Sequence, residues 1–389
     1  MGADVHLLWL QVRSAISTYT NIRYIEVTGA EVGLEDFTAI VIASDMRPTG
    51  TFTSSHALIN QLHKNVIWGM LGNFVSVPTD CPQRDERLGW TGDIQVFAPT
   101  ANFLFDTSGF LSGWLRDLAA EVFQYGIVPE VVPFITLRDN LPPRPHAIWA
   151  DVAIITPNDL YKAFGDANIL EKQYASMQQW LDKGLPRQEN GLWEQSGIQY
   201  GDWLDPKAPP AYPAHGTTDP FLAANAYLVH VTRMIAGIAK ITGRDSDATK
   251  YQNDYERLLK AFRHEYVSPS GRLVSDTQTA LALALQFDLL ETQEQKTKAA
   301  ERLDWLIKWD SFKVSTGFAG TPIILDTLAE NGNLEVAYRM LQERDNPSWL
   351  YPVSMGATTI VSKPSMHELM VSGRDGTRCC QTDESTPVK

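Results

Sequence analysis

The sequence is dominated by stretches in which apolar residues recur every three or four positions, which is the period of an amphipathic helix. Short turns rich in glycine, proline and asparagine separate them, for example 184-GLPRQENG-191 and 205-DPKAPPAYPAHG-216. A series of helix–turn–helix units predicts an all-α array of hairpins, either an open solenoid or a closed α/α barrel. The expected helices are a first one between a cap at Ser54 or Ser55 and Pro78, then 96–105, 109–125, 151–164, 167–183, 219–242, 246–268, 276–288, 293–308, 321–331 and 334–344.

The N-terminal part differs from this pattern. Residues 21–53 are rich in β-branched and aromatic residues, with turn signals at 33-GLED-36 and 47-RPTG-50, and they predict two or three strands. So few strands do not form a stable sheet alone. We therefore expect residues 1–53 to be the remnant of a β-sandwich domain, residues 54–360 to form the helical domain, and residues 361–389, which lack an apolar period, to be an unrelated disordered tail.

Composition excludes several classes of partner. The chain has 33 Lys and Arg against 46 Asp and Glu, a net charge of −13, so nucleic acids and anionic membranes would repel it. The sequence contains no run of about 18 apolar residues, so it does not predict a membrane span. The start, MGADVHLLWLQVRSA, does not resemble a signal peptide, which makes the cytoplasm the default compartment, with secretion the alternative if the true N-terminus is missing. Neither compartment nor oligomeric state is assigned.

Cysteine and histidine usage favours neither a disulfide framework nor a metal centre. Cys81, Cys379 and Cys380 lack the spacing of metal ligands, and the eight histidines include no HExxH pair. His146 and His215 lie in proline-rich loops, where we expect solvated side chains. The sequence therefore predicts no metal and no cofactor.

Tryptophan is frequent and often lies beside an acidic residue in a connection between helices. Loops at one end of a helical barrel converge, so these pairs predict one acidic and aromatic pocket, in which sugar rings stack on indoles and acidic groups bind hydroxyls. The alternative is that the indoles are ordinary core side chains. The pairs are Trp90 with Asp93, Trp149 with Asp151, Trp193 with Glu194, and Trp203 with Asp202 and Asp205.

The densest group of charges lies in 76-SVPTDCPQRDERLGWTGDIQ-95. Pro78 and Pro82 disfavour a helix there, while Gly89 and Gly92 permit tight turns, so the charges are expected on a loop. Glycoside hydrolysis needs a carboxylic acid, a second carboxylate and an aromatic wall, and the stretch supplies these types of residue. The alternative is a salt-bridged turn formed by Arg84, Asp85, Glu86 and Arg87.

This stretch and four others resemble the α-L-rhamnosidases of glycoside hydrolase family 78, over residues 22–360. The resemblance implies an (α/α)6 barrel preceded by β-sandwich domains. It also implies hydrolysis of terminal L-rhamnose, from rhamnose-containing glycosides or polysaccharides, with inversion. The matching segments are 76-SVPTDCPQRDERLGWTGD-93, 148-IWADVAIITPNDLY-161, 201-GDWLD-205, 315-STGFAGTPI-323 and 350-LYPVSMGATTI-360.

By motif position, Glu86 resembles the general acid, and Asp80 and Arg84 resemble ligands of the rhamnose hydroxyls. Trp90 resembles the aromatic wall beside them, and Asp93 a further acid of the pocket. Asp85 is expected to support the loop by pairing with an arginine, and Asn158 replaces a tryptophan frequent in the family at a structural position. Trp149 and Trp203 resemble the other pocket tryptophans of the family.

One family feature is missing. The general base belongs to a Trp-Glu pair after GATTI, but here 355-MGATTI-360 is followed by Val361 and Ser362. Glu368 is the nearest substitute, and its spacing does not match, so no general base is found. Val-Ser-Lys can be encoded by a splice-donor sequence, so we expect the tail to be translated intron, the barrel to be incomplete at its C-terminus, and the product to be marginally stable with little activity. Another inverting (α/α)6 glycosidase and a non-catalytic sugar-binding or defective protein are the alternatives.

Overall fold

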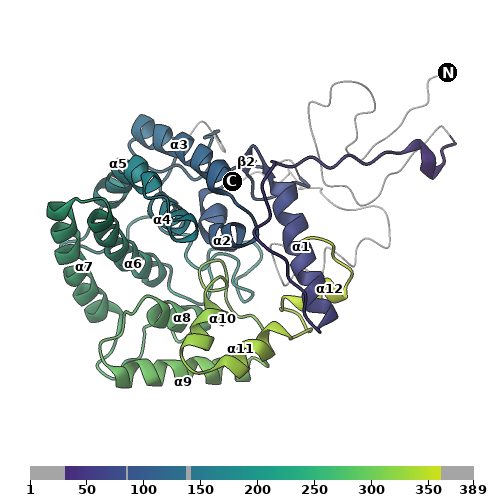
Figure 1. Cartoon of the computed structure of the whole chain (residues 1–389). Helices are drawn as coiled ribbons and strands as arrows, with labels where there is room; N and C mark the ends of the chain where they lie inside the picture. The colour runs from purple at the N-terminus through teal and green to yellow at the C-terminus, as the bar shows by residue number, and fades with distance from the viewer. Residues whose placement is uncertain (1–30, 85, 137–141, 361–389) are drawn as a thin grey trace, which may run out of the picture.

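The computed structural model describes residues 31–84, 86–136 and 142–360. Within these ranges the chain is mainly α, and its helices follow one another in chain order around a ring, as Figure 1 shows. The predicted fold class, a mainly α protein with an (α/α)6 barrel, is therefore confirmed, and the alternative of an open solenoid is not. The helices are α1 (Ala57–Asn73), α2 (Thr91–Leu104), α3 (Ser108–Tyr125), α4 (Val152–Phe164), α5 (Asn168–Lys183), α6 (Pro220–Ile241), α7 (Asp245–Tyr266), α8 (Gln278–Gln286), α9 (Gln293–Trp309), α10 (Ile324–Glu330), α11 (Leu334–Leu341) and α12 (Leu350–Ser354).

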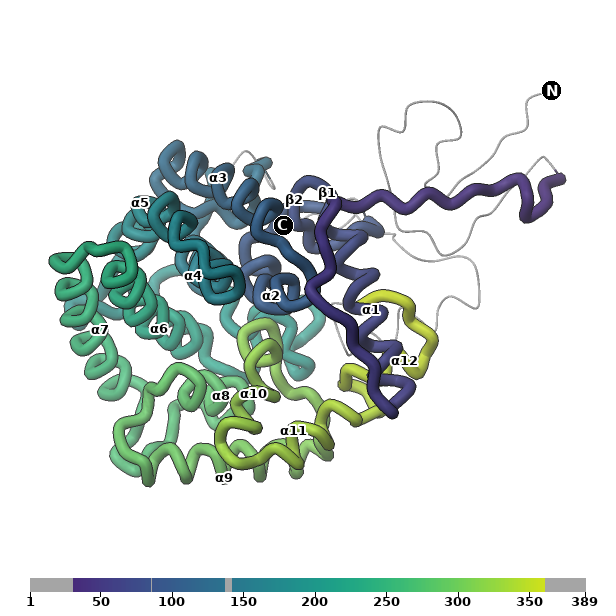
Figure 2. The backbone as a smooth tube through the Cα atoms, in the orientation of Figure 1, coloured from purple at the N-terminus to yellow at the C-terminus, as the bar shows by residue number. Residues whose placement is uncertain are grey.

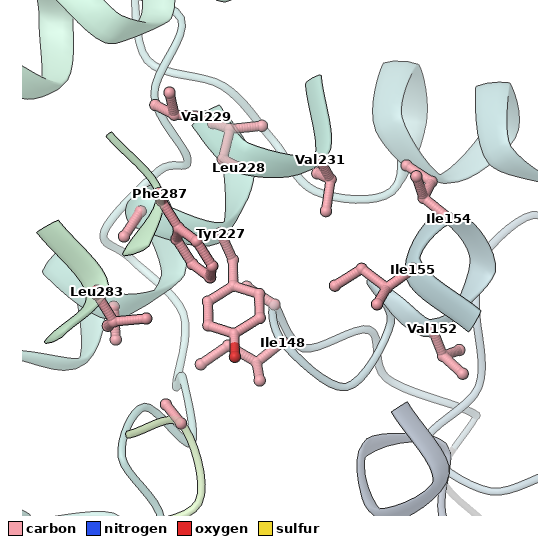
Figure 3. Packing of buried hydrophobic residues seen from close by; sticks show 14 of the residues in the cluster. Ile148, Val152, Ile154, Ile155, Tyr227, Leu228, Val229, Val231, Leu283 and Phe287 are labelled. Atoms are coloured by element: carbon pink, nitrogen blue, oxygen red, sulfur yellow. The ribbon is translucent and has the colours of Figure 1, made fainter. Parts of the chain in front are cut away.

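The ring has inner and outer helices. Helices α2, α4, α6, α8 and α10 pack in series, while α5, α7, α9 and α11 pair with the inner helix before them. Inner α6 is buried along most of its length, whereas outer α7 is buried on one face only. Figure 3 shows the core between α4, α6 and α8, where Tyr227 and Phe287 meet edge to face with ring centroids 5.1 Å apart. Although α6 has the length and apolar character of a membrane span, most of it is buried as a core helix.

The ring closes between the first and last described helices. Asn65 on α1 is fully buried, and its side-chain amide donates a hydrogen bond to the carbonyl of Ala357 at 2.8 Å. Gln61, one turn earlier, donates to the Asn65 side-chain oxygen at 2.8 Å. The hydrogen bond between Asn65 and Ala357 joins residues 292 positions apart. Figure 2 shows the two ends of the ring side by side, α1 in purple and α12 in yellow.

Helix boundaries agree with the sequence prediction to within five residues for all helices except α12, and the largest differences are at the end of α1 and the start of α2. The strongest start is that of α9, where Thr292 and Gln295 form a capping box. Two corrections concern α1 and α12. The α1 cap is His56, whose Nδ1 accepts from the Ile59 amide at 3.3 Å, because Ser54 instead bonds Asn60. Helix α12 was not predicted, since five residues are too few to show a period.

The prediction of strands in residues 21–53 is wrong for residues 31–53, the part of this range that the structure describes. A 3-10 helix, η1 (Leu34–Asp36), is followed by an extended segment that forms no strand ladder in the described structure, although the Ser44 amide donates to the Phe74 carbonyl at 3.0 Å and Pro48 bridges to Phe105. Figure 2 shows this segment outside the ring before it turns along α1. Its apolar side chains, such as Ile40 at 70% exposed, find no partner sheet in the described structure. Residues 1–30 and the tail at 361–389 lie outside the described residues.

Candidate active site

The charged loop begins where α1 ends. Strands β1 (Phe74–Val75) and β2 (Val77–Pro78) form a minimal hairpin, and the chain then folds back on itself until α2 starts at Thr91. Asp80 fixes this return, because its amide donates to the Leu88 carbonyl at 3.0 Å and its Oδ1 accepts from the Leu88 amide at 2.9 Å. The predicted loop therefore exists, but it ends at Trp90, so Gly92 and Asp93 lie in the first turn of α2 and not on the loop.

Glu86 is held between a cation and an indole. Its Oε2 accepts from Arg84 Nε at 2.8 Å and from Arg84 Nη2 at 2.7 Å. Its Oε1 accepts from Trp90 Nε1 at 2.9 Å. The side chain nevertheless stays 34% exposed to the pocket. The Arg84–Glu86 pair of the expected salt-bridged turn is therefore present, and both of its side chains also line the pocket. Asp85 lies outside the described residues.

Asp80 and Cys81 form the buried base of this loop. Asp80 is 7% exposed and accepts a weaker contact from Arg84 Nη2 at 3.3 Å. Burial raises the pKa of Asp80, and burial followed by the neighbouring Asp80 raises the pKa of the Cys81 thiol to about 12. The ligand atoms of Asp80, Cys81 and Glu86 lie within 4.8 Å of one another, which is close enough to hold a metal ion. The Arg84 guanidinium, however, already provides the positive charge that both carboxylates contact.

Asp93 is the most perturbed acid of the pocket. Burial raises its pKa to about 7, and the negative charges of Asp80 and Glu86 act in the same direction. At neutral pH this carboxyl therefore exchanges readily between its protonated and ionised forms. A group of this kind can donate a hydrogen bond to a sugar hydroxyl or accept one.

An aromatic wall faces the charged loop. Trp149 stacks on Phe318 with ring centroids 4.3 Å apart and planes 16° apart. Tyr200 packs edge-on against Trp149 at 4.8 Å and against Trp203 at 5.1 Å. Sugar C–H faces bind to walls of this type. Phe318 and Tyr200 were not predicted, although Phe318 lies in the 315–323 segment that resembled the family.

Charged loop and aromatic wall enclose one cavity of about 870 Å³. Such a volume fits a small-molecule or sugar site. The structure therefore brings together all seven of the residues expected to act on substrate. They are Asp80, Arg84, Glu86, Trp90, Asp93, Trp149 and Trp203.

Trp193 and the acids of the other tryptophan–acid pairs do not line the cavity, which corrects the prediction that every pair faces a common pocket. Trp193 is fully buried under the Arg187 guanidinium, 3.8 Å from the ring centroid. Asp151 is buried and accepts from Trp180 Nε1 at 2.8 Å. Asp205 accepts from the Thr217 amide at 2.7 Å and fixes the loop between them. Asp151 and Asp205 therefore form structural hydrogen bonds. The sequence alone did not show whether these acids bond the surrounding chain or face the pocket.

Asp202 has a related structural role. It is buried and accepts from the amides of Gly317 at 2.8 Å, Ala319 at 3.0 Å and Gly320 at 3.1 Å. These bonds fix the turn that carries Phe318. The glycines of 315-STGFAGTP-322 are thus a barrel turn, as predicted, and a Cβ on Gly317 would lie 2.4 Å from the Asp202 carbonyl oxygen.

The two loop histidines differ from each other. His215 is exposed, as expected, and stacks on Tyr212 at 5.3 Å. His146 is buried, which contradicts the prediction of a solvated side chain, because its Nε2 lies 2.9 Å from Glu130 Oε1. Glu130 lines the cavity and was not predicted. Asn158 is buried within α4, consistent with the structural position that was expected.

A closed ring of helical hairpins with an acidic, aromatic cavity at its wall is the architecture of the six-hairpin class of α/α barrels. Residues 47–370 match the family model described as the bacterial alpha-L-rhamnosidase 6 hairpin glycosidase domain. The chain therefore belongs to this α-L-rhamnosidase family, and the family named from the sequence is confirmed.

Curated relatives and solved structures agree with this membership. An alpha-L-rhamnosidase of Streptomyces avermitilis is 38% identical to this chain, and the match covers 88% of this chain and 32% of the relative. An alpha-L-rhamnosidase of Formosa agariphila is 34% identical, and the match covers 88% of this chain and 37% of the relative. The crystal structure of native alfa-L-rhamnosidase from Aspergillus terreus matches 90% of this chain and 41% of its own with a TM-score of 0.87 and 43% identity. The crystal structure of the Streptomyces avermitilis alpha-L-rhamnosidase complexed with L-rhamnose matches 83% of this chain and 30% of its own chain, with a TM-score of 0.75 and 37% identity.

This chain spans 32% to 37% of the length of the curated relatives it matches. The activity and substrates of the whole relatives are therefore carried over only as proposals.

Proposed function

We propose that this chain forms an α-L-rhamnosidase site, in which the cavity binds a terminal L-rhamnosyl unit and Glu86 protonates the glycosidic oxygen. The observation that carries the proposal is the position of Glu86, whose carboxyl group is fixed by Arg84 and Trp90 at the wall of the cavity. A carboxyl group held at a sugar pocket by two donors is oriented for proton transfer to a bound glycoside.

The proposed reaction is a single displacement. Glu86 gives its proton to the leaving oxygen while the bond between that oxygen and the anomeric carbon breaks. Water attacks the opposite face of the sugar, and a second carboxylate takes the proton of that water. In inverting enzymes the two carboxyl groups are about 6.5–9.5 Å apart, which leaves room for the water. Asp80, Arg84 and Asp93 bind hydroxyls, and Trp90, Trp149 and Trp203 enclose the ring.

The proposed reaction needs a second carboxylate as its general base. The resemblance places it at Ser362, which lies outside the described residues. We propose that hydrolysis by this chain is slow because no carboxylate takes that place, and that binding of L-rhamnose is retained. A division into residues 1–53, a helical domain at 54–360 and a separate tail at 361–389 stays part of the same proposal.

A substrate panel tests the assignment. Aryl α-L-rhamnoside, β-D-glucoside, α-L-fucoside and α-D-mannoside are incubated with the purified chain, and L-rhamnose binding is measured by calorimetry. We expect turnover, however slow, on the rhamnoside only, and binding of L-rhamnose. Preference for another sugar would assign the chain to a different (α/α)6 glycosidase, and binding of L-rhamnose with no turnover would identify a sugar-binding protein.

A further inference from the structure

Glu130 is a carboxylate of the cavity wall that none of the roles above uses. It follows α3 in the chain, and its carbonyl accepts from the Thr91 amide at 2.9 Å. The next residue, Val131, forms a bridge with Trp90. These contacts fix Glu130 to the start of α2, beside the loop that carries Glu86. Its side chain lines the cavity and is 13% exposed.

One oxygen of Glu130 is anchored. Oε1 accepts from the Tyr200 hydroxyl at 2.8 Å and lies 2.9 Å from His146 Nε2. His146 Nδ1 lies 3.0 Å from the carbonyl oxygen of Ile198, which can only accept, so Nδ1 carries a proton.

The charges around Glu130 favour its ionised form. Burial by itself raises the pKa of Glu130. The hydrogen bonds from His146 and Tyr200, together with the positive charges of His146 and Arg144, outweigh burial and hold that pKa below its ordinary value. Arg144 also lines the cavity. At neutral pH Glu130 is therefore a carboxylate, an acceptor of hydrogen bonds at both oxygens.

The second oxygen of Glu130 has no donor. Both of its hydrogen-bonded contacts use Oε1, and no residue in the described ranges donates to Oε2. A charged oxygen in the wall of a sugar cavity is stabilised only when water or a ligand donates to it. We propose that Glu130 is a substrate-recognition residue, in which Oε1 is anchored by His146 and Tyr200 while Oε2 accepts a hydrogen bond from a hydroxyl of the bound L-rhamnosyl unit. This inference rests on the proposed function.

A second role for Glu130 has to be separated from this one. Because Tyr200 contacts Trp149 and Trp203, Glu130 could act on the aromatic wall through Tyr200, either by the hydroxyl contact or by His146, whose ring centroid lies 4.1 Å from that of Tyr200. Removing the hydroxyl, in Tyr200→Phe, takes away the direct contact between Glu130 and Tyr200 and leaves Oε2 in place. Glu130→Gln keeps the shape of the side chain but removes the charge of the acceptor. The two roles therefore predict opposite orders of effect for the two variants.

The experiment measures binding of L-rhamnose by calorimetry to the full chain and to its variants. A hydrogen bond to a charged group predicts a loss of affinity of about 10-fold or more in Glu130→Gln, and less than about threefold in Tyr200→Phe. A matched control is Asp182→Asn. Asp182 also accepts from a lysine and a tyrosine hydroxyl, Lys250 at 2.7 Å and Tyr251 at 3.1 Å, but does not line the cavity. We expect it to bind L-rhamnose as the parent does.

Deoxy analogues of L-rhamnose identify the hydroxyl. The analogue that lacks the partner of Oε2 should bind the parent and Glu130→Gln equally, while the other analogues keep the difference. Equal L-rhamnose affinity in parent and Glu130→Gln, or an equal loss in Tyr200→Phe and Glu130→Gln, would overturn the inference and leave the proposed function standing. A parent chain that binds no L-rhamnose would overturn both. Thermal unfolding of each variant verifies that it is folded.

Discussion

The indole of Trp149 lies directly against the backbone of Gly92, and a Cβ at position 92 would come within 2.4 Å of the indole nitrogen. Gly92 is in the first turn of α2, next to Asp93, so this contact sets the distance between the acidic loop and the aromatic wall. Glycine is required here for close approach, because no other residue leaves room for the ring.

Substitution Gly92→Ala should therefore displace Trp149 from its stack on Phe318 and weaken L-rhamnose binding by about 10-fold, an effect of about 1.4 kcal/mol. Calorimetry and near-ultraviolet circular dichroism report the two effects. Gly109→Ala in α3 is the control, since a Cβ there meets nothing within 4 Å. That variant should bind normally and be as stable as the parent or more so. Normal binding by Gly92→Ala would refute the idea that this contact shapes the pocket.

Glu86→Gln should lose activity in a way that depends on the leaving group. A glutamine cannot donate the proton, so turnover of alkyl rhamnosides should fall by about 100- to 10,000-fold. Aryl rhamnosides with strongly acidic phenols, which leave without protonation, should lose far less. Initial rates over a series of leaving groups measure this, with Glu171→Gln, an exposed partner of Arg244, as the control. A loss of the same size for every leaving group would contradict the role of general acid.

Asp93 should make stability depend on pH. Its pKa is raised from 3.8 to about 7, so between these values the folded chain holds a proton that the unfolded chain has lost. The stabilisation is complete below about pH 4 and is lost as pH rises to about 7, by up to about 1.4 kcal/mol per pH unit. Urea unfolding of the parent and of Asp93→Asn at several pH values measures the difference. Parallel curves for the two proteins would show that Asp93 does not titrate in this way.

Asp202→Ala should destabilise the barrel. The substitution leaves three buried amides of the 317–320 turn without an acceptor, at a cost of about 2–5 kcal/mol. Asp276→Ala, which removes an exposed carboxylate paired with Arg302, should cost less than about 1 kcal/mol. The free energies of unfolding of both variants measure this. Similar values for the two would mean that the Asp202 contacts contribute little.

Installing the missing carboxylate should raise turnover. We expect the double substitution Val361→Trp with Ser362→Glu to increase kcat on an aryl rhamnoside by about 10-fold or more, since a general base contributes at least that much. The pair Val361→Trp with Ser362→Gln has nearly the same shape without the carboxylate and should not differ from the parent. Fast turnover by the unmodified chain would show instead that another group already acts as base.

Much of the fold could be predicted because it depends on local pattern. The periods of α3, α4 and α5 follow directly from the spacing of apolar residues, and these helices end at the glycines Gly126, Gly165 and Gly184. The 37–46 segment shows the limit of this reasoning. Its residues favour a strand, but a strand also needs a continuous partner, and in the described structure the backbone contact of this segment with a strand, from Ser44 to Phe74, does not extend into a ladder.

The sequence by itself determined the charged loop. Asp80, Arg84, Glu86 and Trp90 lie within eleven consecutive positions, so contacts such as Arg84 to Glu86 are short in sequence and follow from loop chemistry. Motif resemblance identified the same residues, and it also located Trp149 and Trp203.

Tertiary structure alone decided which loop side chains face the cavity. Trp203 lines it while Asp202 beside it is buried under the 317–320 turn, and both have the same kind of neighbours in the sequence. Glu130 and Tyr200, 70 positions apart, meet because the connections that follow α3 and α5 are brought together by helix packing. The direction of a side chain from an irregular loop depends on long-range packing, which has no period in the sequence. For that reason the sequence determined the charged loop that carries Glu86, and the folded ring determined the opposite wall of the cavity.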